Sequence, residues 1–424
     1  MDGRGIKRVI VEQREEVEFL LNSGPVIERE LSIDRAFSHP NAVVIMGPRR
    51  AGKSFLALLS VRERPYGYVN FDDERLDPAK ESLNEILRSI YEIYGEVNFL
   101  VFDEIQNAPG WEVFVSRLRR TKRIIVTGSN FRLLSRDLST RLTGRHLDFT
   151  LFPFSFREHL RLKGRSWPLP EVITTAREAE IRRDLDDYIR DGGFPEVHKF
   201  GRSILKTLYE DVLHKDIVLR YKIRKTAPFR DLARLLSSQY GREFTHARIR
   251  SAVGIRDVHT VSKFLDYLVS GFLFIVLERF SFKLKQQFLS PRKIYSIDSG
   301  MLAATAFMIS EDRGRILENL VAVELVRRKH YRGEGEVFYW KNPAGAEVDF
   351  AVKSGPRVVR LIQVCHSFEG LGTKDRELRA LVEASEELRC DDRLVVTDNL
   401  EGEEKYLGKK IRFLPLWKWL LEWT

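Results

Sequence analysis

The chain has 424 residues, of which 43% are hydrophobic and 31% are charged, a composition typical of folded globular proteins and not of disordered ones. Its two cysteines, Cys365 and Cys390, exclude a disulfide framework, and no apolar run approaches the ~20 residues that a membrane-spanning helix needs. The net charge of +10 suits a nucleic-acid partner, or else a highly soluble or heat-adapted surface. Because segment 1–16 is too charged for a signal peptide, we expect a soluble, cytoplasmic protein.

The N-terminal third alternates between strand-like and helix-like patterns. Helical spacing occurs at 11–21, 53–61 and 78–94, and apolar runs of strand length occur at 41–46, 66–71, 99–102 and 124–127. Short, fully apolar strands are buried on both faces, and strands that alternate with helices form parallel sheets. We therefore predict an α/β domain of the nucleotide-binding type.

A glycine-rich loop follows the first of these strands. Segment 47–54 matches the pattern G-x-x-x-x-G-K-[ST] in full and lies between a buried strand and a helix, as the pattern requires. Glycines let amide N–H groups face phosphate oxygens, and the helix N-terminus adds partial positive charge. We expect Lys53 to contact the β- and γ-phosphates and Ser54 to bind Mg²⁺. The predicted nucleotide-binding residues here are Gly47, Pro48, Arg49, Arg50, Ala51, Gly52, Lys53, Ser54 and Phe55.

The next two strand ends carry polar side chains. Asp103 and Glu104 follow an apolar run, and two adjacent carboxylates are costly there without a cation. We expect Asp103 to hold Mg²⁺ and Glu104 to polarise the attacking water. Ser129 and Asn130 end the following strand and are expected to position water, although Gly-Ser-Asn is also common in simple turns.

These three motifs resemble those of AAA+-type ATPases. More narrowly, the chain resembles archaeal and bacterial ATPases that join an AAA+ core to a C-terminal domain of unknown function. Segments 68–75, 142–145, 152–156 and 191–196 also match, so the resemblance covers nearly the whole chain. It implies ATP as the nucleotide and a helical lid after the core.

The resemblance also implies contacts from outside the core sheet. Segment 193–195, Gly-Phe-Pro, resembles a lid motif in which the proline, here Pro195, lies near the adenine. AAA+ proteins usually receive an arginine from a neighbouring subunit, which stabilises charge in the transition state. Arg141 and Arg145 are the best-placed candidates, so we expect a homo-oligomer; the alternative for each is a surface ion pair.

The middle of the chain is mainly helical. Helical patterns at 155–165, 178–190 and 203–220 precede shorter ones at 229–240, 245–254 and 260–268, and strands are expected at 273–282 and 293–297. From 229 onward this order resembles a winged helix, which in its DNA-reading form places the second helix in the major groove. The exposed face of 260–268 is only mildly basic, so a protein contact or a structural role is the alternative.

Beyond residue 300 the predicted order resembles a restriction-endonuclease-like core. It comprises helix 316–329, strands 337–340, 347–352 and 358–364, helix 376–388 and strand 394–397, followed by an aromatic tail. The nuclease site of that fold uses a helix glutamate, an aspartate and a Glu-x-Lys pair, with Mg²⁺ on the carboxylates. Glu318 and Asp349 match, but Gln363 and Cys365 replace the last glutamate and lysine. We predict a degenerate site, structural or nucleic-acid-binding, unless a lysine such as Lys374 substitutes.

The predicted fold is α/β multidomain: a P-loop NTPase core with N-terminal helices (1–152), a helical lid (153–225), a winged helix (226–300) and a restriction-endonuclease-like domain (313–424). The predicted function is Mg²⁺-dependent ATP binding and hydrolysis that drives conformational change, acting on or with nucleic acid. The alternatives are an ATP-controlled DNA-binding switch with slow turnover and a nuclease effector. DNA would bind the winged helix and the C-terminal domain, and no membrane partner is expected.

Overall fold

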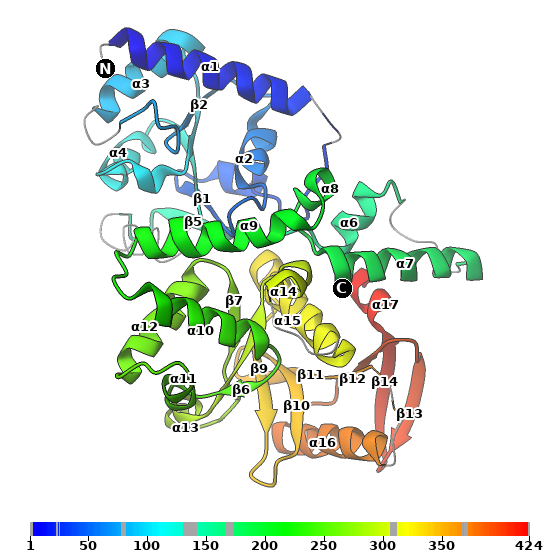
Figure 1. Ribbon diagram of the computed structural model, residues 1–424. Coiled ribbons are helices and arrows are strands. Elements are labelled where there is room, and N and C mark those ends of the chain that lie inside the picture. The colour runs from blue at the N-terminus through cyan, green and yellow to red at the C-terminus, as the bar shows by residue number, and fades with distance from the viewer. Residues whose placement is uncertain are drawn as a thin grey trace. The chain divides into compact units, whose positions relative to one another are not determined.

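The computed structural model describes residues 3–22, 24, 26–77, 82–129, 142–165, 173–305, 312–366, 368 and 372–422 (Figure 1). The chain forms two compact units. Unit 1 comprises Met1–Pro153 and Ser270–Phe272, and unit 2 comprises Phe154–Val269 and Leu273–Thr424. Within the described ranges, no helix has the length and apolar character needed to cross a bilayer.

Unit 1 is built on a parallel sheet with the strand order β2-β3-β4-β1-β5. Its strands are β1 (Ala42–Met46), β2 (Tyr66–Asn70), β3 (Phe99–Asp103), β4 (Arg123–Gly128) and β5 (His146–Thr150). Every residue of β1 and β3 is buried, as their unbroken apolar runs predict, so the parallel α/β prediction is confirmed. Strand β5 was not predicted, because at the sheet edge most of its residues stay partly exposed.

Helices of unit 1 cover this sheet (Figure 1). They are α1 (Gly3–Asn22), α2 (Lys53–Val61), α3 (Leu83–Tyr94) and α4 (Trp111–Leu118), with 3₁₀ turns at Asp34–Ser38 and Ile105–Asn107. Ile6 and Ile10 of α1 and Ile90 of α3 belong to the same apolar core as strand residues such as Phe102. Helix α2 starts at Lys53, so the glycine-rich loop connects the C-terminal end of β1 to the N-terminus of this helix.

The first part of unit 2 is helical and leads into a small sheet. The helices are α6 (Phe156–Leu162), α7 (Thr175–Asp191), α8 (Val197–Phe200) and α9 (Ser203–Asp211), which continues as a π-helix over Val212–Leu219. Then follow α10 (Thr226–Ser238), β6 (Glu243–Phe244), α11 (His246–Ala252), α12 (Val258–Ser270), β7 (Phe274–Leu277), α13 (Leu284–Leu289), β8 (Arg292–Ser296) and α14 (Ser299–Thr305). The sheet has the order β6-β8-β7, and the predicted apolar face of α12 is buried.

The C-terminal part of unit 2 is a six-stranded mixed sheet with the order β13-β14-β12-β11-β10-β9. Its elements are α15 (Arg313–Arg332), β9 (Glu336–Lys341), β10 (Glu347–Ser354), β11 (Arg357–Cys365), α16 (Thr373–Leu388), β12 (Arg393–Thr397), β13 (Gly402–Tyr406), β14 (Lys409–Pro415) and α17 (Leu416–Leu421). In Figure 1, α15 lies above this sheet and α16 below it. The hairpin β13–β14 was not predicted, because β13 is charged and mostly exposed.

A buried carboxylate joins two segments of unit 2 that are far apart in sequence. Asp298 accepts hydrogen bonds from the main-chain N–H groups of Gly193 at 2.7 Å and Met301 at 2.8 Å. A Cβ atom at Gly300 would lie 2.3 Å from the carbonyl oxygen of Asp191, so these segments can approach this closely only with glycine there. The Gly-Phe-Pro segment that resembles a lid motif is therefore held by the turn between β8 and α14.

Candidate nucleotide-binding site

The glycine-rich loop has the geometry that its sequence predicts. Gly47 and Gly52 have φ angles of 149° and 94°, which other residues rarely adopt, and a Cβ at Gly47 would lie 2.1 Å from the Leu151 carbonyl oxygen. Arg29 braces the loop by donating hydrogen bonds to the carbonyl oxygens of Ala51 at 2.8 Å and Phe152 at 2.7 Å. Sequence reasoning missed Arg29, because no local motif marks it.

The lysine of the loop points inward. Lys53 is 4% exposed, and its ammonium group donates to the carbonyl oxygens of Gly47 at 3.1 Å and Pro48 at 3.0 Å. Glu104 Oε1 lies 3.9 Å from the same nitrogen. Charge-assisted hydrogen bonds to phosphate oxygens are stronger than those to neutral carbonyls. The ammonium would therefore exchange its carbonyl partners for the phosphate oxygens of a bound triphosphate.

Asp103 lies at the C-terminal end of β3, buried beside the loop. Its carboxylate accepts hydrogen bonds from Tyr68 Oη at 3.0 Å, from the Thr127 hydroxyl and from the Ser54 side chain. Burial, and then the neighbouring Glu104, raise the pKa of Asp103, while these three hydrogen bonds oppose the rise. A divalent cation next to Ser54 and Asp103 would stabilise the charged carboxylate, so this pair fits a Mg²⁺ ion.

Glu104 adopts a left-handed backbone conformation with φ 48°, which turns the chain immediately after β3. Its main-chain N–H donates to Thr127 Oγ1 at 3.0 Å. Its carboxylate accepts hydrogen bonds from Ser129 Oγ at 3.2 Å and from the Gln106 side chain. The structure thus brings the ends of β3 and β4 together, as expected for adjacent parallel strands.

Several residues predicted for this site either lie outside the described residues or have their described contacts with residues other than Lys53, Ser54, Asp103 and Glu104. Asn130 and Arg141 lie outside the described residues. Arg145 is exposed just before β5, and Arg49 lies 3.8 Å from Asp72. Pro195 belongs to unit 2, where it follows the fully buried Phe194. The roles of Pro195 and of the two candidate trans-acting arginines stay predictions.

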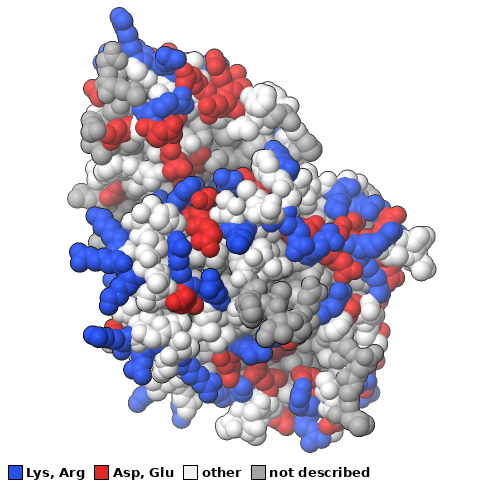
Figure 2. Space-filling model, viewed as in Figure 1, with Lys and Arg blue, Asp and Glu red and all other residues white. Residues whose placement is uncertain are grey.

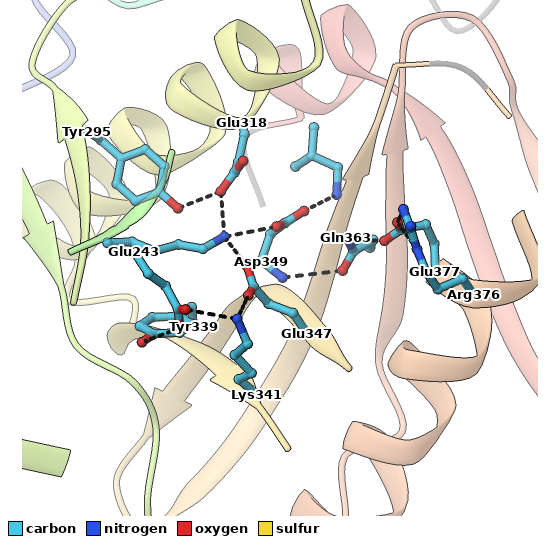
Figure 3. A network of polar contacts seen from close by, with 12 residues as sticks. Glu243, Tyr295, Glu318, Tyr339, Lys341, Glu347, Asp349, Gln363, Arg376 and Glu377 are labelled. Atoms are coloured by element: carbon cyan, nitrogen blue, oxygen red, sulfur yellow. Dashed lines mark hydrogen bonds and ion pairs between the residues drawn. The ribbon is translucent and has the colours of Figure 1, made fainter. Parts of the chain in front are cut away.

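Three of the four residues predicted for a degenerate nuclease site, Glu318, Asp349 and Gln363, lie in one network of polar contacts (Figure 3). The main-chain N–H of Asp349 donates to Gln363 Oε1 at 3.3 Å, and Glu318 and Asp349 both contact one lysine. Burial, and then Glu318, raise the pKa of Asp349, whereas Lys293 lowers it. Cys365 is buried at the end of β11.

The suggestion that Lys374 replaces the missing nuclease lysine is wrong. Its ammonium pairs with Glu404 at 2.6 Å, and both side chains are more than two-fifths exposed. The lysine that contacts Glu318 and Asp349 is Lys293 of β8. No spacing rule pointed to it, because it comes from another sheet.

The parallel sheet, the glycine-rich loop and the acidic strand end define unit 1 as a domain of the P-loop ATPase class. Family models agree: residues 39–160 match an AAA domain, and residues 182–312 and 313–419 match two domains of unknown function, DUF8612 and DUF4143. The chain is 33% identical over 419 residues to the uncharacterized protein MJ1544 of Methanocaldococcus jannaschii, covering 93% of this chain and 91% of that one. It therefore belongs to the family of archaeal and bacterial proteins that join an AAA domain to a C-terminal DUF4143 domain.

Two further similarities are more distant. An uncharacterized protein of Haemophilus influenzae is 25% identical over 336 residues, which is 74% of this chain and 80% of that protein. Among solved structures, the Walker-type ATPase PABY2304 of Pyrococcus abyssi is 17% identical with a TM-score of 0.43, covering 66% of this chain and 96% of that one.

Proposed function

We propose that unit 1 binds ATP together with Mg²⁺ and hydrolyses it. The observation that carries this proposal is the convergence of Lys53, Ser54, Asp103 and Glu104 at one edge of the parallel sheet, with Ser54 hydrogen-bonded to Asp103. The match to an AAA domain supports the nucleotide class.

Each group has a distinct role in the proposed reaction. The main-chain amides of 47–54 and the Lys53 ammonium bind the phosphates. Ser54 and Asp103 would hold Mg²⁺, which would neutralise charge on the β- and γ-phosphate oxygens. Glu104 orients the attacking water and accepts its proton, while Ser129 fixes the Glu104 carboxylate. Tyr68 and Thr127 orient Asp103.

The first test removes the phosphate-binding ammonium. Lys53→Ala is expected to weaken Mg·ATP binding at least tenfold, about 1.4 kcal/mol, because it removes the buried ammonium that the carbonyl oxygens of Gly47 and Pro48 hold in the loop. Isothermal titration calorimetry measures the affinity. Lys7→Ala, which removes a half-exposed lysine of α1, is the control and should bind as the parent does. Parental affinity in Lys53→Ala would contradict the proposed site.

We further propose that the α10–β8 region, read as a winged helix, contacts nucleic acid. Acidic side chains are few in segment 222–256, and its exposed basic residues are Lys222, Arg224, Lys225, Arg230, Arg234, Arg242, Arg248, Arg250 and Arg256. In Figure 2, Lys and Arg side chains stand out at the left edge of the view, where Figure 1 places α10 and α12. Such a cluster is the electrostatic footprint of phosphate binding.

The salt dependence of DNA affinity tests the proposed contact between the α10–β8 region and nucleic acid. Replacing Arg248, Arg250 and Arg256 with alanine should weaken DNA binding uniformly across sequences and reduce the salt slope by about one for each lost phosphate contact. Fluorescence anisotropy at two or more salt concentrations measures both. The substitution Lys405→Ala in the exposed hairpin β13–β14 is the control. An unchanged slope in the triple variant would contradict DNA binding by this region.

Turnover separates the two ways in which nucleic acid and ATP could be linked. An ATPase rate that DNA stimulates supports a motor or remodeller, whereas slow turnover that ignores DNA supports a switch. In either case we propose that the protein is cytoplasmic and that ATP hydrolysis drives a conformational change in it. We also propose that a neighbouring subunit supplies Arg141 or Arg145 to the transition state.

A further inference from the structure

A single lysine lies among three carboxylates in unit 2 (Figure 3). The Lys293 ammonium is 2.7 Å from Glu347, 2.9 Å from Glu318 and 3.2 Å from Asp349. Its side chain is 3% exposed. Tyr295 donates a further hydrogen bond to Glu318 at 2.7 Å. The ammonium therefore occupies the point on which the carboxylates converge.

The three carboxylates make a cation necessary at this place. Buried carboxylates are costly without a cation, and removing one partner of a buried ion pair leaves the others uncompensated. Although burial alone lowers the pKa of Lys293, Glu318 and the other carboxylates raise it well above its usual range, so the lysine stays charged. The nearby Lys341 is about a quarter exposed and binds Glu243 and Glu347, but it lies outside the Glu318–Asp349 pair.

The cation and the carboxylates come from different sheets. Lys293 lies on β8 of the three-stranded sheet, whereas Glu318 lies on α15 and Asp349 on β10. Two other hydrogen bonds also join the region of the three-stranded sheet to the C-terminal domain. The Ser296 N–H donates to Asn319 Oδ1 at 2.8 Å, and the main-chain N–H of Phe280 donates to the Tyr339 carbonyl oxygen at 2.7 Å. The lysine thus lies at a seam between two parts of unit 2.

We propose that Lys293 is the resident cation of this acidic cluster, where it keeps divalent metal out and locks the three-stranded sheet to the C-terminal domain. A catalytic lysine must reach a phosphate or a water, whereas this one is buried and fully engaged by carboxylates. With the lysine in place, the described residues offer no group of three or more His, Cys, Asp or Glu side chains that could hold a metal ion. On this proposal the C-terminal domain acts as a platform.

Thermal unfolding tests the lock. Lys293→Met keeps the length and apolar stem but removes the charge, and it should lower the midpoint of the unit 2 transition by about 10 °C. The matched control Lys341→Met removes a partly solvated lysine from the same network and should lower it by less than about 3 °C. Equal effects of the two substitutions would overturn the proposal. If Lys293→Met does not fold, Lys293→Met/Glu318→Gln is measured; it should fold, since one carboxylate leaves with the ammonium, and its failure would also overturn the proposal.

Manganese tests the exclusion of metal. Without nucleotide, millimolar MnCl₂ should leave the parental midpoint unchanged and raise that of Lys293→Ala by about 5 °C, because the vacated space admits a divalent ion. No rise in Lys293→Ala would overturn the proposed exclusion. So would Mn²⁺ binding by the parent that Asp349→Asn abolishes. Mn²⁺-dependent cleavage of DNA that is lost in Lys293→Met would show that the lysine is catalytic and would equally overturn the lock.

Discussion

Glu104→Gln is expected to bind Mg·ATP with parental affinity and to lose at least about 100-fold in kcat, the contribution typical of a positioned general base. Glutamine keeps the size of glutamate and can still accept the hydrogen bond from Ser129, so the local geometry should survive. Its amide, however, cannot take a proton from water. Binding by calorimetry and phosphate release at saturating ATP together separate the two effects.

The control for this variant makes the same chemical change elsewhere in unit 1. Glu63→Gln alters a side chain that is 84% exposed in the turn after α2, and it should leave kcat unchanged. If Glu104→Gln turned over ATP at the parental rate, the water-activating role would belong to another group. If it lost nucleotide binding instead, Glu104 would have a structural role in the loop.

The nucleotide site could be predicted because its parts are local in sequence. Segment 47–54 is one continuous motif, and Asp103 and Ser129 each end an apolar run, so parallel pairing alone brings them together. The residues that hold Asp103 and the glycine-rich loop in place have no such signal in the sequence. Tyr68 and Thr127 lie within strands, and their hydroxyl groups donate to Asp103. Tyrosine and threonine are common in strands, so nothing in the sequence marks these two as partners of Asp103. Arg29 acts from a loop before β1.

The C-terminal cluster shows the same limit more sharply. Glu318 and Asp349 were identified from the resemblance to a restriction-endonuclease-like core, and the absence of the expected lysine at Cys365 was also visible. The replacement was sought next to the motif, at Lys374, whereas the fold supplies Lys293 from a different sheet. The strands β5 and β13 were missed for another reason: they are partly exposed, so burial does not impose an apolar pattern on them.

Buried charge also organises the other end of unit 2, around Glu324 of α15. Its carboxylate accepts hydrogen bonds from Arg157 at 2.8 Å, from Arg328 at 3.1 Å and from Arg327. Arg157 and Arg328 in turn donate to main-chain carbonyl oxygens of Leu420 and Trp419 in α17. One carboxylate, 1% exposed, therefore pairs with three guanidinium groups, two of which also hold the C-terminal helix.

Glu324→Gln is expected to lower the free energy of unfolding of unit 2 by about 3–5 kcal/mol, because it leaves buried arginines without their anion. Urea denaturation followed by circular dichroism measures the loss. Glu401→Gln breaks the exposed pair with Lys418 and serves as the control, with an expected change within about 0.5 kcal/mol. Equal losses at the two positions would show that Glu324 contributes no more than a surface ion pair.

The pH dependence of this difference follows from the Glu324 pKa. Burial alone would raise that pKa, but Arg157 and the two neighbouring arginines lower it to about 2, from an ordinary value of 4.5. A carboxyl group with a lowered folded-state pKa contributes its full stability above the unfolded value and loses it as the pH falls through the folded one. The gap between the parent and Glu324→Gln should therefore be constant above about pH 5 and narrow between about pH 4.5 and 2. A gap that stayed constant down to pH 2 would mean that shape, and not charge, accounts for the loss.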